Sequence, residues 1–166
     1  TYPLPEAQVD RFMLKLRIGY PTKAEERSIV DRMASSAPTQ LSATNAMTLD
    51  RVASLRALVD RVHLDPRVRD YIVDLVHASR DPKEAGLDGV DRLIEFGASP
   101  RASISLAHAA RAHALLRGRD YATPADVKAI AMEVLRHRVA PSYEAEAENV
   151  SADDLVAKLL DHVPAP

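Results

Sequence analysis

The chain has 166 residues and a formal net charge of −2, with basic and acidic residues mixed along it, which speaks against a nucleic-acid-binding surface with clustered lysine and arginine. It has no cysteine, so disulfides and thiolate metal sites are excluded, and a reducing compartment is permitted. No run reaches the ~18 apolar residues of a membrane span, and the many alanine, leucine and valine residues favour helices packed through aliphatic side chains.

The N-terminal segment is expected to combine one helical turn with one strand. Pro5 and Glu6 both suit the first turn of a short helix. Between Phe12 and Ile18, apolar residues occupy every second position, which is the period of a half-buried strand. A single strand leaves its own backbone groups unpaired. We therefore expect its sheet in an upstream part of a longer protein, in keeping with an opening residue that is not methionine.

Three helices are predicted in the next part of the chain. Thr22 and Glu25 have the spacing of a capping box at the start of the first. Residues 34–47 are small and polar and predict a loop. The second helix follows Thr48, and Asp65 restarts the helical pattern of apolar residues in a third.

A central helix is predicted after residue 98. Residues 81–89 predict a loop, and residues 90–96 predict a short helical turn. Ser99 is a good N-cap, and Pro100 then falls at the first helical position, where its missing N–H costs nothing. The helix should run to about residue 117 and end at Gly118. Its body is small or apolar on nearly every face, so it should be buried on several sides.

The C-terminal part predicts two more helices. One begins at Thr123-Pro124 and runs to about His137, and the last is opened by Ser151. Residues 140–149 between them are acidic and predict irregular structure. The expected fold is an all-α bundle of about five or six helices around the Ser99–Arg117 helix.

The sequence lacks the usual motifs for binding nucleotide phosphates and magnesium. It contains no G-x-x-x-x-G-K-[S/T] phosphate loop and no acidic strand end that would hold magnesium. His108 and His113 are five residues apart, a poor spacing for sharing a metal on one helix, so we predict no metal site.

Two arginines stand out as candidate anion ligands. Arg101 lies in the first turn of the central helix, where a cation opposes the helix dipole unless an anion is nearby. The simpler interpretation is a surface arginine paired with Glu95 or Asp91. Arg11 lies between the helical turn and the predicted strand, and its simpler interpretation is a surface pair with a neighbouring acid, Asp10 or Glu6.

Several motifs resemble MoxR-type AAA+ ATPases, in order and over nearly the whole chain. Leu4-Pro-Glu-Ala-Gln-Val-Asp-Arg-Phe12 resembles the arginine-finger segment of that family. Gly97-Ala-Ser-Pro-Arg-Ala-Ser103, Ala109-Ala-Arg-Ala-His-Ala114 and Gly118-Arg-Asp-Tyr-Ala-Thr-Pro124 are similar to its sensor 2 region. Asp65-Pro-Arg-Val-Arg-Asp-Tyr-Ile72 fits the preceding helix. Magnesium chelatase ATPase subunits and MCM helicases share the plan more distantly.

The resemblance implies a division of the chain and two site residues. Residues 1–21 would be the end of the nucleotide-binding core, and residues 22–166 would be the helical lid domain. Arg11 corresponds to the arginine finger, which acts in trans on the γ-phosphate of a neighbouring subunit's ATP. Arg101 corresponds to sensor 2, which couples lid position to nucleotide state. Whether Arg101 contacts the ATP of its own subunit or of a neighbour stays open.

The resemblance also implies cofactors and partners. ATP and magnesium would serve the full-length protein, whereas the isolated fragment is expected to hold no cofactor and to hydrolyse no ATP. Other copies of the same ATPase would form a ring, a hexamer in the family. A von Willebrand A-domain protein is a possible client for such a cytoplasmic chaperone, and neither nucleic acid nor membrane is an expected partner.

Two alternatives to a lid remain open. A helical DNA-binding module could use residues 118–137 as a turn and recognition helix, although Asp126 and Glu133 lie on that helix. A non-catalytic protein-interaction domain would show a large exposed apolar patch and an internal ion pair of Arg101.

Overall fold

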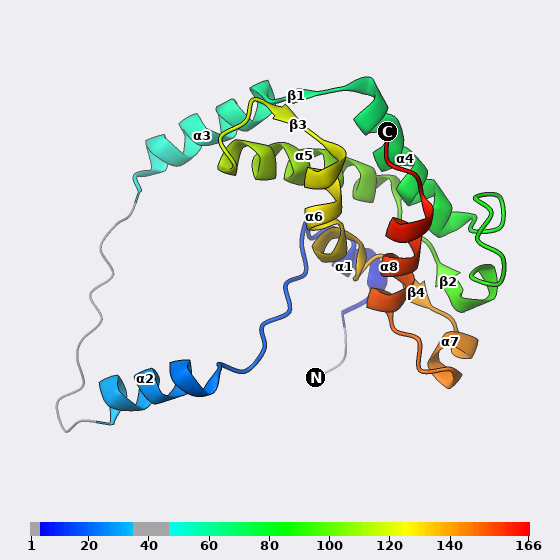
Figure 1. The fold of residues 1–166 in the computed structure, drawn as a ribbon, viewed down its shortest axis with the longest axis horizontal. Helices are drawn as coiled ribbons and strands as arrows, with labels where there is room; N and C mark the ends of the chain where they lie inside the picture. Colours follow the sequence, from blue (N-terminus) through cyan, green and yellow to red (C-terminus); the bar gives the residue numbers. More distant parts are fainter. Residues whose placement is uncertain (1–3, 35–46) are drawn as a thin grey trace.

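The computed structural model describes residues 4–34 and 47–166, and the described chain is mostly helical (Figure 1). Its α-helices are α1 (Glu6–Val9), α2 (Lys23–Met33), α3 (Leu49–Arg61), α4 (Pro66–Arg80), α5 (Pro100–Leu116), α6 (Pro124–Leu135), α7 (Tyr143–Ala147) and α8 (Ala152–His162). The strands are β1 (His63–Leu64), β2 (Ile94–Phe96), β3 (Tyr121–Ala122) and β4 (Ala140–Pro141). The all-α prediction is confirmed, with more helices than expected because α1 and α7 are single turns.

Helix α5 lies at the centre of the bundle formed by α3 to α8, as predicted. It contacts α3, α4 and α6, as well as β1 and β3. The side chain of Ser99 caps it by accepting from the backbone N–H of Arg101, and Pro100 occupies its first turn. Gly118 adopts a φ of 75°, the left-handed conformation that ends a helix with least strain in glycine.

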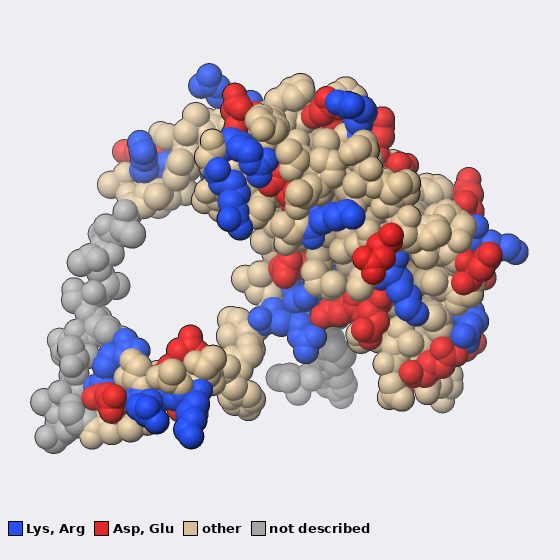
Figure 2. Space-filling view, in the orientation of Figure 1, with Lys and Arg blue, Asp and Glu red and all other residues tan. Residues whose placement is uncertain are grey.

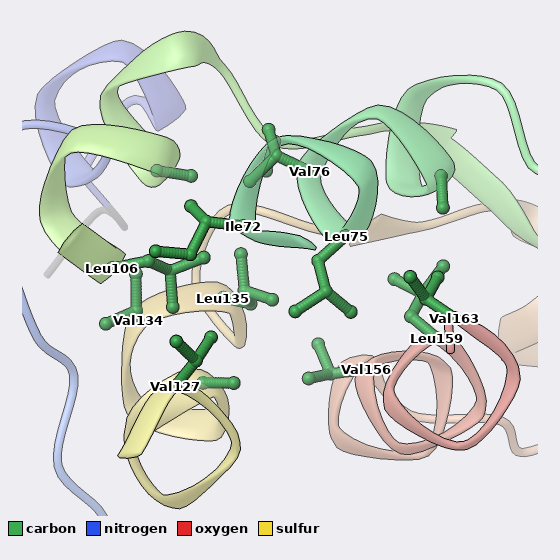
Figure 3. Packing of buried hydrophobic residues seen from close by; sticks show 14 of the residues in the cluster. Ile72, Leu75, Val76, Leu106, Val127, Val134, Leu135, Val156, Leu159 and Val163 are labelled. Atoms are coloured by element: carbon green, nitrogen blue, oxygen red, sulfur yellow. The ribbon is translucent and has the colours of Figure 1, made fainter. Parts of the chain in front are cut away.

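The hydrophobic core lies where α4, α5, α6 and α8 meet (Figure 3). Its fully buried side chains include Ile72, Leu75 and Val76 of α4, Leu106 of α5, Val127, Val134 and Leu135 of α6, and Val156 and Leu159 of α8. The alanines of α5 let these helices approach closely, since Ala102, Ala110 and Ala114 have no exposed surface.

Two short strand pairs hold connecting loops against the bundle. Strands β1 and β3 are parallel, with His63 opposite Tyr121, and β2 and β4 are antiparallel. The helical turn predicted at 90–96 is therefore only partly right, because a 3₁₀ turn at Asp91–Leu93 leads into β2.

The acidic stretch predicted to be irregular contains β4 and α7. Ser142 caps α7 by accepting from the N–H of Ala145, and its hydroxyl donates to the carbonyl of Arg92 at 2.6 Å. Glu144 and Glu146 lie in the first turn of α7, where the helix dipole favours negative charge. The acidic composition therefore marks a helix start here.

The strand predicted at Phe12–Ile18 does not form. No strand pairs with these residues within the described ranges 4–34 and 47–166, and their apolar side chains are exposed. The segment is extended and attached to the bundle by the N–H of Lys15, which donates to the carbonyl of Glu133 at 2.8 Å. A segment with alternating apolar residues forms a strand only beside another strand, and the described part of the chain offers none to residues 12–18.

Helix α2 has the predicted Thr22–Glu25 capping box but buries no residue and lies apart from the bundle in Figure 1. The loop predicted at 34–47 lies mostly outside the described residues. Among the described helices, none is both long and apolar enough to cross a membrane.

Candidate functional site

The start of α5 is held against the end of α4. A Cβ atom on Gly97 would lie 2.3 Å from the carbonyl oxygen of Ser79, so only glycine permits this approach of the two backbones. The N–H of Ala98 donates to the Ser79 hydroxyl at 3.0 Å. The next residues, Ser99 and Arg101, are thereby fixed in position at the N-terminal end of α5.

The carboxylate of Asp10 lies at this helix end. It accepts from the Ser99 hydroxyl, at 2.9 Å to Oδ2, and from the Arg138 Nε at 3.0 Å to Oδ1. A third donor is Arg101, whose guanidinium nitrogen lies 3.4 Å from Oδ2. A negative charge at the N-terminal end of a helix is favourable because the free backbone N–H groups carry partial positive charge. Asp10 is therefore the anion that offsets the cation in the first turn of α5.

Arg101 pairs with Asp10, so the expected simpler pairing with Glu95 or Asp91 is not the one the structure has. The Arg101 side chain remains 63% exposed. Exposed pairs of this kind contribute only about 0–1 kcal/mol. Another anion could thus replace Asp10 as the partner of Arg101 at little cost.

Arg11 is exposed next to this cluster. The Asp10 carboxylate, one of its expected surface partners, is instead engaged by Ser99, Arg101 and Arg138. The other expected partner, the Glu6 side chain, lies outside the described part of the chain. Arg11 thus directly follows, in the sequence, the residue whose carboxylate Arg101 contacts.

Sequence reasoning missed Arg138, the most buried cation of the site. Its side chain is 1% exposed and lies just after α6. Its terminal nitrogens donate to the carbonyls of Asp10 at 2.9 Å, Phe12 at 2.6 Å and Met13 at 3.1 Å. The available signal was a basic residue directly before the buried Val139, in a region where the pattern of α6 had been expected to end.

Burial lowers the pKa of both Arg138 and His137, and it favours the neutral form of the histidine. Burial lowers the pKa of Arg138, and the hydrogen bond to Asp10 opposes that shift. Arginine nevertheless stays protonated in proteins. Burial also lowers the pKa of His137, partly offset by the hydrogen bond that its Nε2 donates to the Phe12 carbonyl at 2.9 Å. Both side chains therefore bind the backbone of the segment that carries Arg11.

A second polar cluster surrounds Asp126 at the start of α6. Its carboxylate, 1% exposed, accepts from Arg119 at 2.5 and 2.7 Å, from the Thr123 N–H at 2.8 Å and from His113 Nδ1 at 2.7 Å. Burial raises the pKa of Asp126, but the hydrogen bonds from Arg119 and Thr123 outweigh it and hold the pKa far below its ordinary value. This cluster joins α5, α6 and the turn between them.

Two hollows flank these clusters. One, of about 500 Å³, is bordered by Asp10, Lys15, Ser99 and Arg138. The other, of about 580 Å³, is an apolar groove formed by α3, α5, α6 and the N-terminal segment; its lining includes Leu14, Val59, His108, Ala112, His113 and Ile130. No group of three or more potential metal ligands occurs among the residues that the structure describes.

Comparisons with known proteins agree on one family. A family model described as "AAA lid domain" matches residues 89–159. Chaperone MoxR1 of Mycobacterium tuberculosis is 39% identical over 166 residues, which is 100% of this chain and 43% of that protein. Protein MoxR of Methylorubrum extorquens is 33% identical over 177 residues, which is 100% of this chain and 51% of that protein.

A solved structure is similar over the same range. The crystal structure of a "putative ATPase" from Cytophaga hutchinsonii has a TM-score of 0.93 and 36% sequence identity, covering 99% of this chain and 50% of that one. The chain thus spans about half the length of the relatives it matches.

Proposed function

We propose a function for this chain on the premise that it corresponds to the C-terminal region of a MoxR-type AAA+ ATPase. In this proposal residues 22–166 are the lid domain and residues 1–21 are the end of the nucleotide-binding core. The lid couples ATP binding and hydrolysis to movement of the subunits in a chaperone-like complex.

The contact between Arg101 and Asp10 is the observation that carries this proposal. Arg101 lies in the first turn of the central helix of the bundle, and Asp10 directly precedes Arg11. A shift of α5 would therefore also displace the segment that holds Arg11. Lid position and the placement of a second cation are linked through one carboxylate.

The exposed cations of the site fit a phosphate group. Arg101 is 63% exposed and its pair with Asp10 is long, at 3.4 Å, so its guanidinium can turn to a phosphate oxygen. In this proposal Arg101 acts as sensor 2. Release of Asp10 on binding, and its recapture on product loss, would link phosphate binding at Arg101 to the residue that directly precedes Arg11.

Arg11 is proposed as the arginine finger of a neighbouring active site. ATP with magnesium would supply the phosphoryl group that is transferred to water. The planar guanidinium of Arg11 would stabilise the charge that develops on the transferred group, an effect worth on the order of 10³–10⁵ in rate in other NTPases. Such a role in trans requires other copies of the same chain, arranged as a ring.

The proposed setting is a cytoplasmic chaperone whose client could be a von Willebrand A-domain protein. Nucleic acid is not a proposed partner. On the face shown in Figure 2, lysine and arginine are interspersed with aspartate and glutamate, whereas phosphate backbones are bound by clustered basic residues.

Substitution of Arg101 in the full-length protein tests the proposal. We expect Arg101→Ala to reduce steady-state ATP hydrolysis at least tenfold, because the lid no longer responds to the phosphate. Arg101→Lys should restore little, since lysine lacks the planar fork that holds two phosphate oxygens. Arg117→Ala, at the exposed other end of α5, is the matched control. Wild-type hydrolysis by Arg101→Ala would contradict the sensor role.

The apolar groove favours a second candidate, a non-catalytic interaction module. Its volume of about 580 Å³ and the internal pair of Arg101 are both features that such a module would show. The same experiment separates the two candidates, because ATP hydrolysis by the full-length protein would not depend on Arg101 if this region only bound a partner.

A further inference from the structure

The backbone around Arg11 is fastened to the bundle by several hydrogen bonds from one buried side chain, that of Arg138. Arg138 donates to three carbonyls within four residues, those of Asp10, Phe12 and Met13, and its Nε donates to the Asp10 carboxylate. Arg11 is the residue between these attachment points. Its backbone is therefore bound on both sides, while its own side chain is exposed.

We call this set of hydrogen bonds from Arg138 the Arg138 clamp. The same guanidinium also binds two residues of the bundle. The Nη1 atom of Arg138 donates to the Val134 carbonyl at 2.5 Å, and its Nη2 atom lies 3.3 Å from the Ser105 hydroxyl. Ser105 belongs to α5 and Val134 to α6, the two helices that form the centre of the fold. One guanidinium thus joins the Asp10–Met13 segment to the rigid core.

The energetics indicate that this arrangement is specific to arginine. A buried cation is costly unless its donors are all satisfied, and removal of its partners is strongly destabilising. The five N–H donors of arginine lie in a fixed plane and can serve carbonyls on both sides. Lysine presents its donors from one point, so it cannot reach all of these acceptors at once.

We propose that Arg138 is a positioning residue for Arg11, holding the Asp10–Met13 segment to α5 and α6 so that the finger moves with the lid. This inference rests on the proposed role of Arg11. If Arg138 holds this segment, the lid of each subunit sets where its own Arg11 lies relative to the nucleotide of the neighbouring subunit. A loosely held finger would reach the phosphoryl group only part of the time.

ATP hydrolysis by full-length Arg138→Lys protein is the main test. We expect kcat to fall by about 10–100-fold, the range in which a misplaced catalytic group reduces a rate. KM for ATP should stay within about twofold, because Arg138 touches no nucleotide-binding group. Arg136→Lys is the matched control: that side chain is also mostly buried, but it pairs with Asp153 at 3.2 Å and not with the Asp10–Met13 segment.

A double substitution separates positioning from a general structural role. If Arg138 acts through Arg11, then Arg138→Lys should cause no further loss of single-turnover rate in protein that already carries Arg11→Ala. If the two losses multiply, Arg138 acts elsewhere and the inference is overturned.

His137→Ala provides a second variant in case Arg138→Lys does not fold. His137 donates to the Phe12 carbonyl from a partly exposed position. We expect a smaller loss of kcat, again absent when Arg11 is already alanine; a loss that persists there would overturn the inference.

The failure of this inference can be told from failure of the proposed function. A defective Arg11→Ala protein together with a folded, fully active Arg138→Lys protein would overturn the clamp alone. A fully active Arg11→Ala protein would overturn the finger, and the clamp with it.

Discussion

At the residue scale, buried charged side chains such as Asp126 connect helices and turns to one another. It completes a capping box with Thr123 at the start of α6 while also binding His113 of α5 and Arg119 of the turn between them. A carboxylate with this many donors stabilises the fold only while it is ionised.

We expect Asp126→Ala to destabilise the 166-residue chain by on the order of 3 kcal/mol, because it leaves the partly buried Arg119 unpaired. Asp154→Ala is the matched control. Asp154 has the same capping-box position in α8 but is exposed, so its loss should cost about 1 kcal/mol. Urea unfolding at pH 7 measures both, and equal costs would show that burial of Asp126 contributes nothing.

The same carboxylate predicts a pH dependence. The folded-state pKa of Asp126 is lowered, so its contribution is complete above the unfolded pKa of about 3.9 and is lost as pH falls below that value. The stability difference between wild type and Asp126→Ala should therefore shrink on acidification below about pH 4. A difference that grows with acid would contradict the assigned direction.

At the scale of the element, α5 depends on small side chains. Ala110 has no exposed surface, while Ala107 is only partly buried. Ala110→Leu should therefore overpack the core at a cost of about 1–3 kcal/mol, and Ala107→Leu should cost less. Thermal unfolding followed by circular dichroism measures both. An unchanged melting temperature for Ala110→Leu would contradict the central placement of α5.

Helix starts were the features that the sequence predicted best. Thr22, Ser99 and Ser151 each cap the helix expected of them, because capping is decided by a few adjacent residues. The Phe12–Ile18 strand and the acidic stretch before Ser151 were predicted wrongly, since their structure depends on partners far away in the chain. Ser142, for example, is fixed by a bond to Arg92, fifty residues earlier.

The candidate site was predictable only in part, for the same reason. Arg101 could be singled out because a cation in a first helical turn is locally unfavourable. Its partner Asp10 lies 91 positions away, and Arg138 lies 128 positions from Asp10. No local sequence pattern indicates that an arginine is buried and donates to backbone carbonyls of a distant segment.

At the scale of the whole molecule, we propose that the bundle and residues 10–13 move as one unit. Segment 10–13 is held by Arg138, His137 and the Asp10 cluster. In a ring of copies, movement of one lid would then be passed to the active site of the next subunit through Arg11. That claim concerns two subunits, so a single chain cannot test it.

Mixing two inactive full-length variants tests it most directly. Arg11→Ala subunits keep their own nucleotide site, and subunits with a disabled phosphate loop keep their Arg11. If Arg11 acts in trans, mixed rings contain interfaces that combine an intact site with an intact finger, and ATP hydrolysis should reappear at a clear fraction of the wild-type rate. The control is each variant assayed alone, which should stay inactive. No recovery in rings shown to contain both variants would contradict the account.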